Sequence, residues 1–302
     1  MLQVLPNPHA QISVENDIPS AGRKLDAPAA VRLWHLTSLD APTVAVVWSL
    51  TFAWAAGVRL PAWIPVLLAL ASWAVYIGDR ILDARAAFRT ANLDTLRERH
   101  LFHHRHRRLL APAALAAACA ALCIVFTQMP SVARERNSVL AVAALAYFTG
   151  VHSSRKIPTF GLPPLLKKEL LVGLLFTAAC ALPAFSRVTA HGASTRGLLS
   201  AVALFFVLLA WLNCHAIDRW ETPHRTQGSQ IFTPACLLAA AALPLAAFLS
   251  SAHPRFAALL IAGAASALLL ALLDRSRSHL TPIALRAAAD LALLTPLVLF
   301  FK

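Results

Sequence analysis

Long apolar stretches alternate with short polar connections along most of this chain. Nine stretches can be distinguished, at roughly residues 41–58, 61–78, 109–128, 138–152, 165–185, 197–214, 231–250, 255–273 and 283–301. Because a helix rises 1.5 Å per residue, about 20 apolar residues span the hydrocarbon core of a bilayer. The pattern predicts an all-α integral membrane protein, a bundle of about nine transmembrane helices.

The first part of the chain differs from the rest. Residues 1–35 are mostly polar, contain prolines and lack the apolar core of a secretory signal peptide. The sequence therefore predicts a flexible cytoplasmic N-terminal tail over residues 1–35 and one nine-helix transmembrane domain over residues 36–302.

Composition and charge support this interpretation. The chain is 58% hydrophobic and only 14% charged, whereas about a quarter of the residues of a soluble domain are charged. The net charge of +13 comes from basic residues spread over short connections, where they orient helices and contact anionic lipid. Nucleic acid is therefore not expected as a partner.

The basic residues also predict an orientation. With a cytoplasmic N-terminus, 20 Lys and Arg residues fall on the inner side of the membrane and 7 on the outer side. This bias follows the positive-inside rule. It indicates a multi-pass protein of a bacterial-type inner membrane, with the ends of the second and sixth helices facing the cytoplasm.

Two carboxylates interrupt the apolar pattern at the inner end of the second helix. Asp79 and Asp83 follow a run from Leu60 to Gly78 that contains no charged side chain. Residues four apart share one helix face, so both carboxylates can reach one ligand. A charge at membrane depth costs roughly 2.5–3.5 kcal/mol on insertion scales and usually has a function.

A second polar group ends the sixth helix. His215, Asp218 and Glu221 are spaced by three residues and form one polar strip if the helix continues. Carboxylates on two helices can hold Mg²⁺ that bridges the protein to a diphosphate. The alternative is that each cluster only pairs with the arginines beside it. Arg286 and Asp290, four apart in the last stretch, are likewise expected to form a structural ion pair.

With these residues in place, the chain resembles the UbiA superfamily of intramembrane prenyltransferases over roughly residues 36–301. Members of that family have nine helices and two aspartate-rich motifs, at the cytoplasmic ends of the second and sixth. Asp79, Arg80 and Asp83 match the first motif, N-D-x-x-D-x-x-x-D, and Arg89-Thr90 stands near an expected Arg-Thr pair. Val75-Tyr76 replaces the leading Asn-Asp, and Asp218 with Glu221 matches the second motif in part.

The resemblance implies transfer of a prenyl group from an allylic diphosphate to an electron-rich, lipophilic acceptor, with Mg²⁺ as cofactor. Asp79, Asp83, Asp218 and Glu221 would be the catalytic, metal-binding residues. The missing Asn-Asp pair leaves open a divergent or non-catalytic relative that binds isoprenoid lipid. Chain length, acceptor and oligomeric state are not readable from the sequence.

Further residues are expected to bind the substrate. Basic groups must meet the charge of the leaving diphosphate, and the predicted substrate-binding residues are Tyr76, Arg80, Arg89, Lys156, Lys168 and His215. Tyr76 lies one turn before Asp79 and could stabilise a carbocation through its ring. Packing against a neighbouring helix is the alternative for this side chain.

The connection between the second and third helices is rich in histidine. His100, His103 and His104 spell H-x-x-H-H, which resembles one histidine box of membrane di-iron desaturases. Three interpretations stay open: a basic amphipathic loop on the inner leaflet with Leu101 and Phe102 turned inward, a lid that brings Arg89 or His103 to a diphosphate, and an iron site. The third would make the protein a di-iron oxidoreductase.

Overall fold

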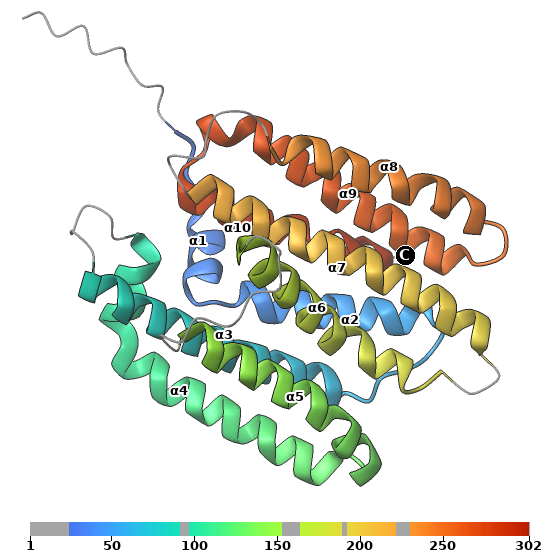
Figure 1. Cartoon of the computed structure of the whole chain (residues 1–302), viewed down its shortest axis with the longest axis horizontal. Coiled ribbons are helices and arrows are strands. Elements are labelled where there is room, and N and C mark those ends of the chain that lie inside the picture. The colour runs from blue at the N-terminus through green and yellow to red at the C-terminus, as the bar shows by residue number, and fades with distance from the viewer. Residues whose placement is uncertain (1–23, 91–96, 153–163, 189–191, 222–229, 302) are drawn as a thin grey trace, which may run out of the picture.

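The computed structural model describes residues 24–90, 97–152, 164–188, 192–221 and 230–301. The described residues form helices joined by short connections (Figure 1). The α-helices are α1 (Ala29–Leu36), α2 (Asp40–Ala55), α3 (Trp63–Thr90), α4 (Glu98–Gln128), α5 (Ser131–His152), α6 (Pro164–Phe185), α7 (Ala193–Glu221), α8 (Phe232–Leu249), α9 (Pro254–Ser276) and α10 (Pro282–Ala292), with 3-10 helices η3 (Arg277–His279) and η4 (Thr295–Phe300).

The fold is all-α, as the apolar pattern predicts, and each of the nine stretches coincides with a helical element. By length and hydropathy, α3, α4, α7, α8 and α9 can each cross a membrane, and α1 with α2, bent by 89°, gives a sixth candidate. Together they make the chain a multi-pass integral membrane protein.

The helices pack mainly in consecutive pairs. α3 lies along α4, α6 along α7 and α8 along α9, while α2 runs between α3 and α6 (Figure 1). The core lies where α2, α6, α7 and α9 meet: Trp48 and Phe206 stack with ring centroids 3.8 Å apart, and the Trp48 indole N–H donates to the Leu293 carbonyl at 2.9 Å. This bond joins α2 to the C-terminal segment.

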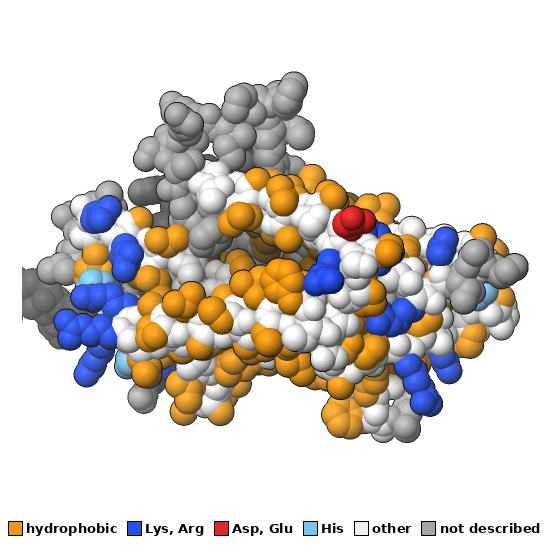
Figure 2. All heavy atoms as spheres, turned by 90° about the horizontal axis from the view of Figure 1, so that it is seen from below, with side chains coloured by type: hydrophobic (Ala, Val, Ile, Leu, Met, Phe, Trp, Pro, Cys, Tyr) orange, Lys and Arg blue, Asp and Glu red, His pale blue; other side chains and the backbone are white. Residues whose placement is uncertain are grey.

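The outer surface is apolar, as a lipid-facing surface should be. Leu109, Leu115 and Phe126 of α4 are more than 60% exposed, and so are Leu237 and Phe248 of α8. Figure 2 shows one face covered largely by hydrophobic side chains and hollowed near its middle, with basic side chains toward both ends.

Asp274 joins the ends of three helices. This buried carboxylate, on α9, accepts from the Trp220 indole at 2.9 Å, from the backbone N–H groups of Ile231 and Phe232 at 3.2 and 3.0 Å, and from Arg277 at 3.0 Å. It satisfies N–H groups at the start of α8 that have no partner within that helix. The ends of α7 and α9 and the start of α8 are thereby held together.

Two predictions about element boundaries need correction. Residues 29–35 of the expected tail belong to α1, and His35 is buried together with Leu36; residues 1–23 lie outside the described part. The histidine-rich segment is not a loop, because residues 98–108 are the first turns of α4. The long helices α3 and α4 thus extend well beyond their apolar stretches.

Candidate functional site

A sharp turn between α1 and α2 organises one part of the site. Ser38 has φ of 58°, a left-handed conformation, and the N–H groups of Ser38 and Leu39 donate to the carbonyls of His35 and Trp34, both at 3.0 Å. This pattern is a Schellman motif, which satisfies the last carbonyls of a helix. The Ser38 hydroxyl also lies 3.2 Å from Nε2 of His103 on α4. The turn brings His35 and Asp40 to the same place.

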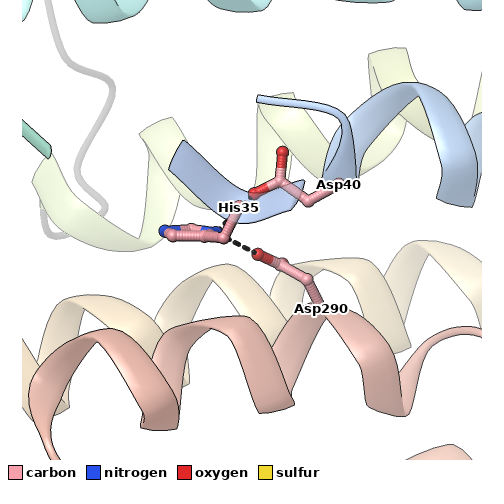
Figure 3. A group of neighbouring side chains, drawn as sticks. All are labelled: His35, Asp40 and Asp290. Carbon is pink, nitrogen blue, oxygen red and sulfur yellow. Dashed lines mark ion pairs between the residues drawn. The ribbon is translucent and has the colours of Figure 1, made fainter. Parts of the chain in front are cut away.

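His35, Asp40 and Asp290 form a buried cluster (Figure 3). Nδ1 of His35 lies 2.7 Å from a carboxylate oxygen of Asp40 and 3.5 Å from one of Asp290. Asn213 on α7 donates its amide N–H to the other Asp290 oxygen at 3.2 Å. The sequence prediction that Asp290 pairs with Arg286 is wrong, because the ion-pair partner of Asp290 in the described structure is His35.

Glu221, at the end of α7, contacts three arginines from two other segments. One carboxylate oxygen accepts from Arg286 at 2.7 Å and from Arg99 at 3.1 Å; the other accepts from Arg97 and from Arg99 at 3.3 Å. Arg97 also donates to the Glu221 carbonyl at 3.1 Å. The expected role of Glu221 as a metal ligand therefore needs revision, because both of its oxygens are engaged by guanidinium groups.

Tyr76 and Arg80 contact each other on α3. The Arg80 guanidinium donates to the Tyr76 hydroxyl and lies over the ring, 4.4 Å from its centroid. Arg80 is buried, with 5% of its surface exposed. The cation over Tyr76 is therefore a side chain of the protein, which corrects the expectation of a ring available to a carbocation.

Asp79 and Asp83 lie half-buried on α3. Tyr147 of α5 is in electrostatic range of both carboxylates and of Cys214 on α7. Asp218 is four residues after Cys214, so it lies on the same face of α7. Tyr147 is thus near the acidic residues of α3 and near the face of α7 that carries Asp218, and each of these three aspartates also has interactions of its own.

His215 links α7 to α6. Its Nδ1 is 2.7 Å from a carboxylate oxygen of Glu169 on α6, Trp211 stacks on its ring, and Arg219 donates to Nε2 at 3.4 Å. Glu169 was not expected to matter, although a single acidic residue near the start of an apolar helix was the available signal. Because α7 continues to Glu221, His215 belongs to the predicted strip with Asp218, and its ring contacts Glu169, Trp211 and Arg219.

The structure shows little about the remaining predicted substrate-binding residues. Arg89 lies exposed in the last turn of α3. Lys156 lies outside the described residues, as does the side chain of Lys168, whose backbone belongs to α6.

The histidines of the H-x-x-H-H segment contact separate partners. His103 is buried between the Ser38 hydroxyl and the Arg99 carbonyl, to which its Nδ1 lies 2.8 Å distant, and His104 stacks on Phe88 with centroids 4.0 Å apart. Leu101 is 48% exposed rather than turned inward. Among the described residues, the one set of three side chains close enough to share an ion is His35, Asp40 and Asp290, so this segment shows no iron site there.

A cavity of about 270 Å³ is lined by several basic side chains. It lies at the junction of α7, η3 and α10, and Lys24, Arg219, Arg277 and Trp220 contribute to its lining. Trp220 also borders a smaller pocket next to Glu221 and Arg286. Basic side chains are therefore concentrated at this end of the bundle.

Comparison with known proteins found no relative of this chain. A scan against models of protein families, a search of curated proteins and a search of solved structures each found no match. The functional interpretation therefore rests on the residues and their geometry.

Proposed function

We propose that this protein is a membrane prenyltransferase-like enzyme, which moves a prenyl group from an allylic diphosphate to an electron-rich, lipophilic acceptor. The observation that carries the proposal is the group of arginines around Glu221. Arg97, Arg99 and Arg286 contact one carboxylate, so three positive charges meet one negative charge at the end of an otherwise apolar bundle. An excess of two positive charges favours a diphosphate.

The geometry of arginine suits this role. A guanidinium offers several N–H donors in a planar fork and binds phosphate oxygens in pairs. Arg99 uses two of its nitrogens on Glu221, at 3.1 and 3.3 Å. Glu221 thus orients the arginines, which would donate to the oxygens of a bound diphosphate and stabilise the charge that develops as it leaves.

Asp79, Asp83 and Asp218 are the residues that would hold Mg²⁺. Carboxylate oxygens on α3 and α7 fit a cation that needs one or two carboxylates and completes its shell with substrate phosphates and water. The ion would neutralise charge on the diphosphate oxygens.

The reaction requires little proton transfer by side chains of the protein. The bond between the allylic carbon and the diphosphate oxygen breaks, both electrons leave with the diphosphate, and the acceptor attacks the allylic carbon and then loses a proton. The apolar helices would exclude water from the cation. This chemistry fits a site at the membrane boundary, where a lipid substrate and a charged group meet.

The proposal includes a UbiA-like arrangement with nine crossings. In it α5, α6 and α10 with η4 complete the set formed by the longer helices, and the N-terminus and the site face the cytoplasm. The motif residues on α3 and α7 and the positive-inside bias of the sequence support this arrangement. Membrane lipid and the two substrates are then the partners.

Turnover of a labelled prenyl diphosphate by the purified protein in nanodiscs tests the function. We expect Mg²⁺-dependent transfer to an aromatic lipophilic acceptor, reduced at least 100-fold in Asp79→Asn and in Asp218→Asn. Asp26→Asn is the control, because Asp26 is an exposed carboxylate near Thr281, away from these residues. Unchanged turnover in both site variants would refute the assignment, and binding without turnover would favour a non-catalytic isoprenoid-binding protein.

A further inference from the structure

The cluster of His35, Asp40 and Asp290 has no part in the proposed reaction, although Asp290 lies one turn from Arg286 on α10. One ligand atom from each side chain lies within 4.8 Å of the other two. His35 is 4% exposed and Asp40 is 1% exposed. Three segments supply the ligands: the end of α1, the start of α2 and the last turn of α10 (Figure 3). We propose that this cluster binds a divalent transition-metal ion of the Zn²⁺ type.

The buried polar atoms of the cluster have few partners outside it. Nδ1 of His35 and Oδ2 of Asp40 and of Asp290 contact one another, at 2.7 and 3.5 Å from the imidazole nitrogen, and make no other hydrogen bond. Asn213, which is 5% exposed, already reaches Asp290 with its amide nitrogen, and its amide oxygen has no partner either. Buried polar atoms without partners are rare in folded proteins.

The charge of the cluster is a second reason to expect a bound metal ion. Asp40 and Asp290 are two carboxylates whose ion pairs, in the described part of the chain, are both with His35. Arg286 is hydrogen-bonded to Glu221, and Arg80, whose charge also acts on Asp40, is hydrogen-bonded to the Tyr76 hydroxyl. With His35 neutral, as a metal ligand must be, two buried carboxylates leave negative charge beyond what Arg80 offsets, and a dication can neutralise it.

The ligand types select the metal. Imidazole nitrogen with two carboxylate oxygens suits Zn²⁺, with Zn–N and Zn–O distances near 2.0–2.2 Å. Mg²⁺ prefers oxygen ligands and keeps several waters in octahedral geometry, for which this buried cluster has little room. On binding, His35 and Asp40 would move apart by a few tenths of an ångström, because tetrahedral ligands around zinc lie more than 3 Å from each other.

Bound metal would join the two ends of the chain. His35 and Asp40 flank the turn at Ser38, whereas Asp290 lies near the C-terminus and contacts Asn213 of α7. We therefore expect the ion to fix the α1–α2 turn on α10, as structural zinc sites do. This role does not depend on the proposed transfer reaction.

The test uses the full-length protein in detergent. After metal is removed with chelator and returned by dialysis, we expect about one Zn²⁺ per chain by elemental analysis, a higher thermal midpoint with Zn²⁺, and visible absorption bands with Co²⁺ that excess Mg²⁺ does not abolish. Asp290→Asn, which keeps the shape of the side chain, should lose at least 90% of the bound metal.

The control is His215→Ala, which removes a histidine that also lies 2.7 Å from a carboxylate, but from only one; it should keep full zinc content. Wild-type protein with less than about one-tenth of an equivalent of zinc and no change in thermal midpoint would overturn the proposal. So would equal metal content in wild type and Asp290→Asn. If the variant fails to fold, the zinc and cobalt measurements on wild-type protein alone decide the question, and neither result bears on prenyl transfer.

Discussion

Ser38 holds the α1–α2 turn in a backbone conformation that residues other than glycine rarely adopt. With φ of 58° it forms the left-handed position that ends α1, and its hydroxyl contacts His103 at 3.2 Å. Both properties matter for the position of His35 and Asp40, since these residues stand on either side of the turn. Mutation of Ser38 can therefore separate the effect of backbone strain on stability from the effect of the side-chain hydrogen bond.

Ser38→Gly and Ser38→Ala separate the two contributions. Both variants lose the bond to His103, but only glycine relieves the left-handed strain, which is worth about 1 kcal/mol for a residue with a Cβ. We expect Ser38→Ala to unfold at a lower temperature than Ser38→Gly. Thermal unfolding of the detergent-solubilised proteins measures the order, and an alanine variant as stable as the glycine variant would contradict this account of the turn.

Some of the site residues could be predicted from the sequence and others could not, for one physical reason. Asp79, Asp83, Asp218 and Glu221 could be picked out because each interrupts a long apolar helix, which is a local signal. His35 and Asp40 gave no such signal, and Asp290, although it interrupts the last apolar stretch, pointed to Arg286; the three residues come together only when α1, α2 and α10 pack. The spacing of four that suggested an Arg286–Asp290 pair was overridden by tertiary contacts, in which Arg286 meets Glu221 and Asp290 meets His35.

At the scale of elements, the α6–α7 pair shows how closely these helices approach. A Cβ on Gly173 would lie 3.0 Å from the carbonyl oxygen of Val207 and 3.1 Å from the backbone nitrogen of Trp211. Backbone atoms cannot move aside as side chains do. Small residues that let helix backbones meet are a usual device of membrane bundles, which lack a hydrophobic drive between helices.

Gly173→Ala should therefore push α6 away from α7. We expect a loss of about 1–3 kcal/mol, as for other overpacked sites, and a weaker His215–Glu169 contact between the same helices. Gly197→Ala is the matched control, because a Cβ there meets nothing within 4 Å and alanine favours the helix. Thermal midpoints of the two variants give the comparison; equal midpoints would show that the helices separate without cost.

The positions of the helices were the most predictable feature. All nine apolar stretches became helical elements, because apolar runs of this length report local burial in lipid. Their ends were harder to predict: α3 continues to Thr90, α4 begins at Glu98, and the last stretch divides into α10 and η4. Those ends depend on contacts between elements, such as Arg97 and Arg99 with Glu221, which no single stretch contains.

At the scale of the molecule, charge and apolar surface are separated. Exposed leucine and phenylalanine side chains cover the long helices, whereas Arg80, Arg97, Arg99 and Arg286 gather with Glu221 at one end of the bundle. A substrate with a long apolar chain and a charged head matches this division. The central claim is that these arginines recognise the diphosphate.

Binding of a prenyl diphosphate, compared with the alcohol of the same chain length, tests that claim most directly. In nanodiscs we expect wild-type protein to bind the diphosphate at least 100-fold more tightly. Arg99→Gln should reduce this preference about 10-fold, because a hydrogen bond to a charged group is worth about 1.5–3 kcal/mol. Arg196→Gln, at the start of α7 where the side chain bonds the Val188 carbonyl at 2.8 Å, should leave the preference unchanged. Equal affinity for the diphosphate and the alcohol in wild-type protein would contradict the account.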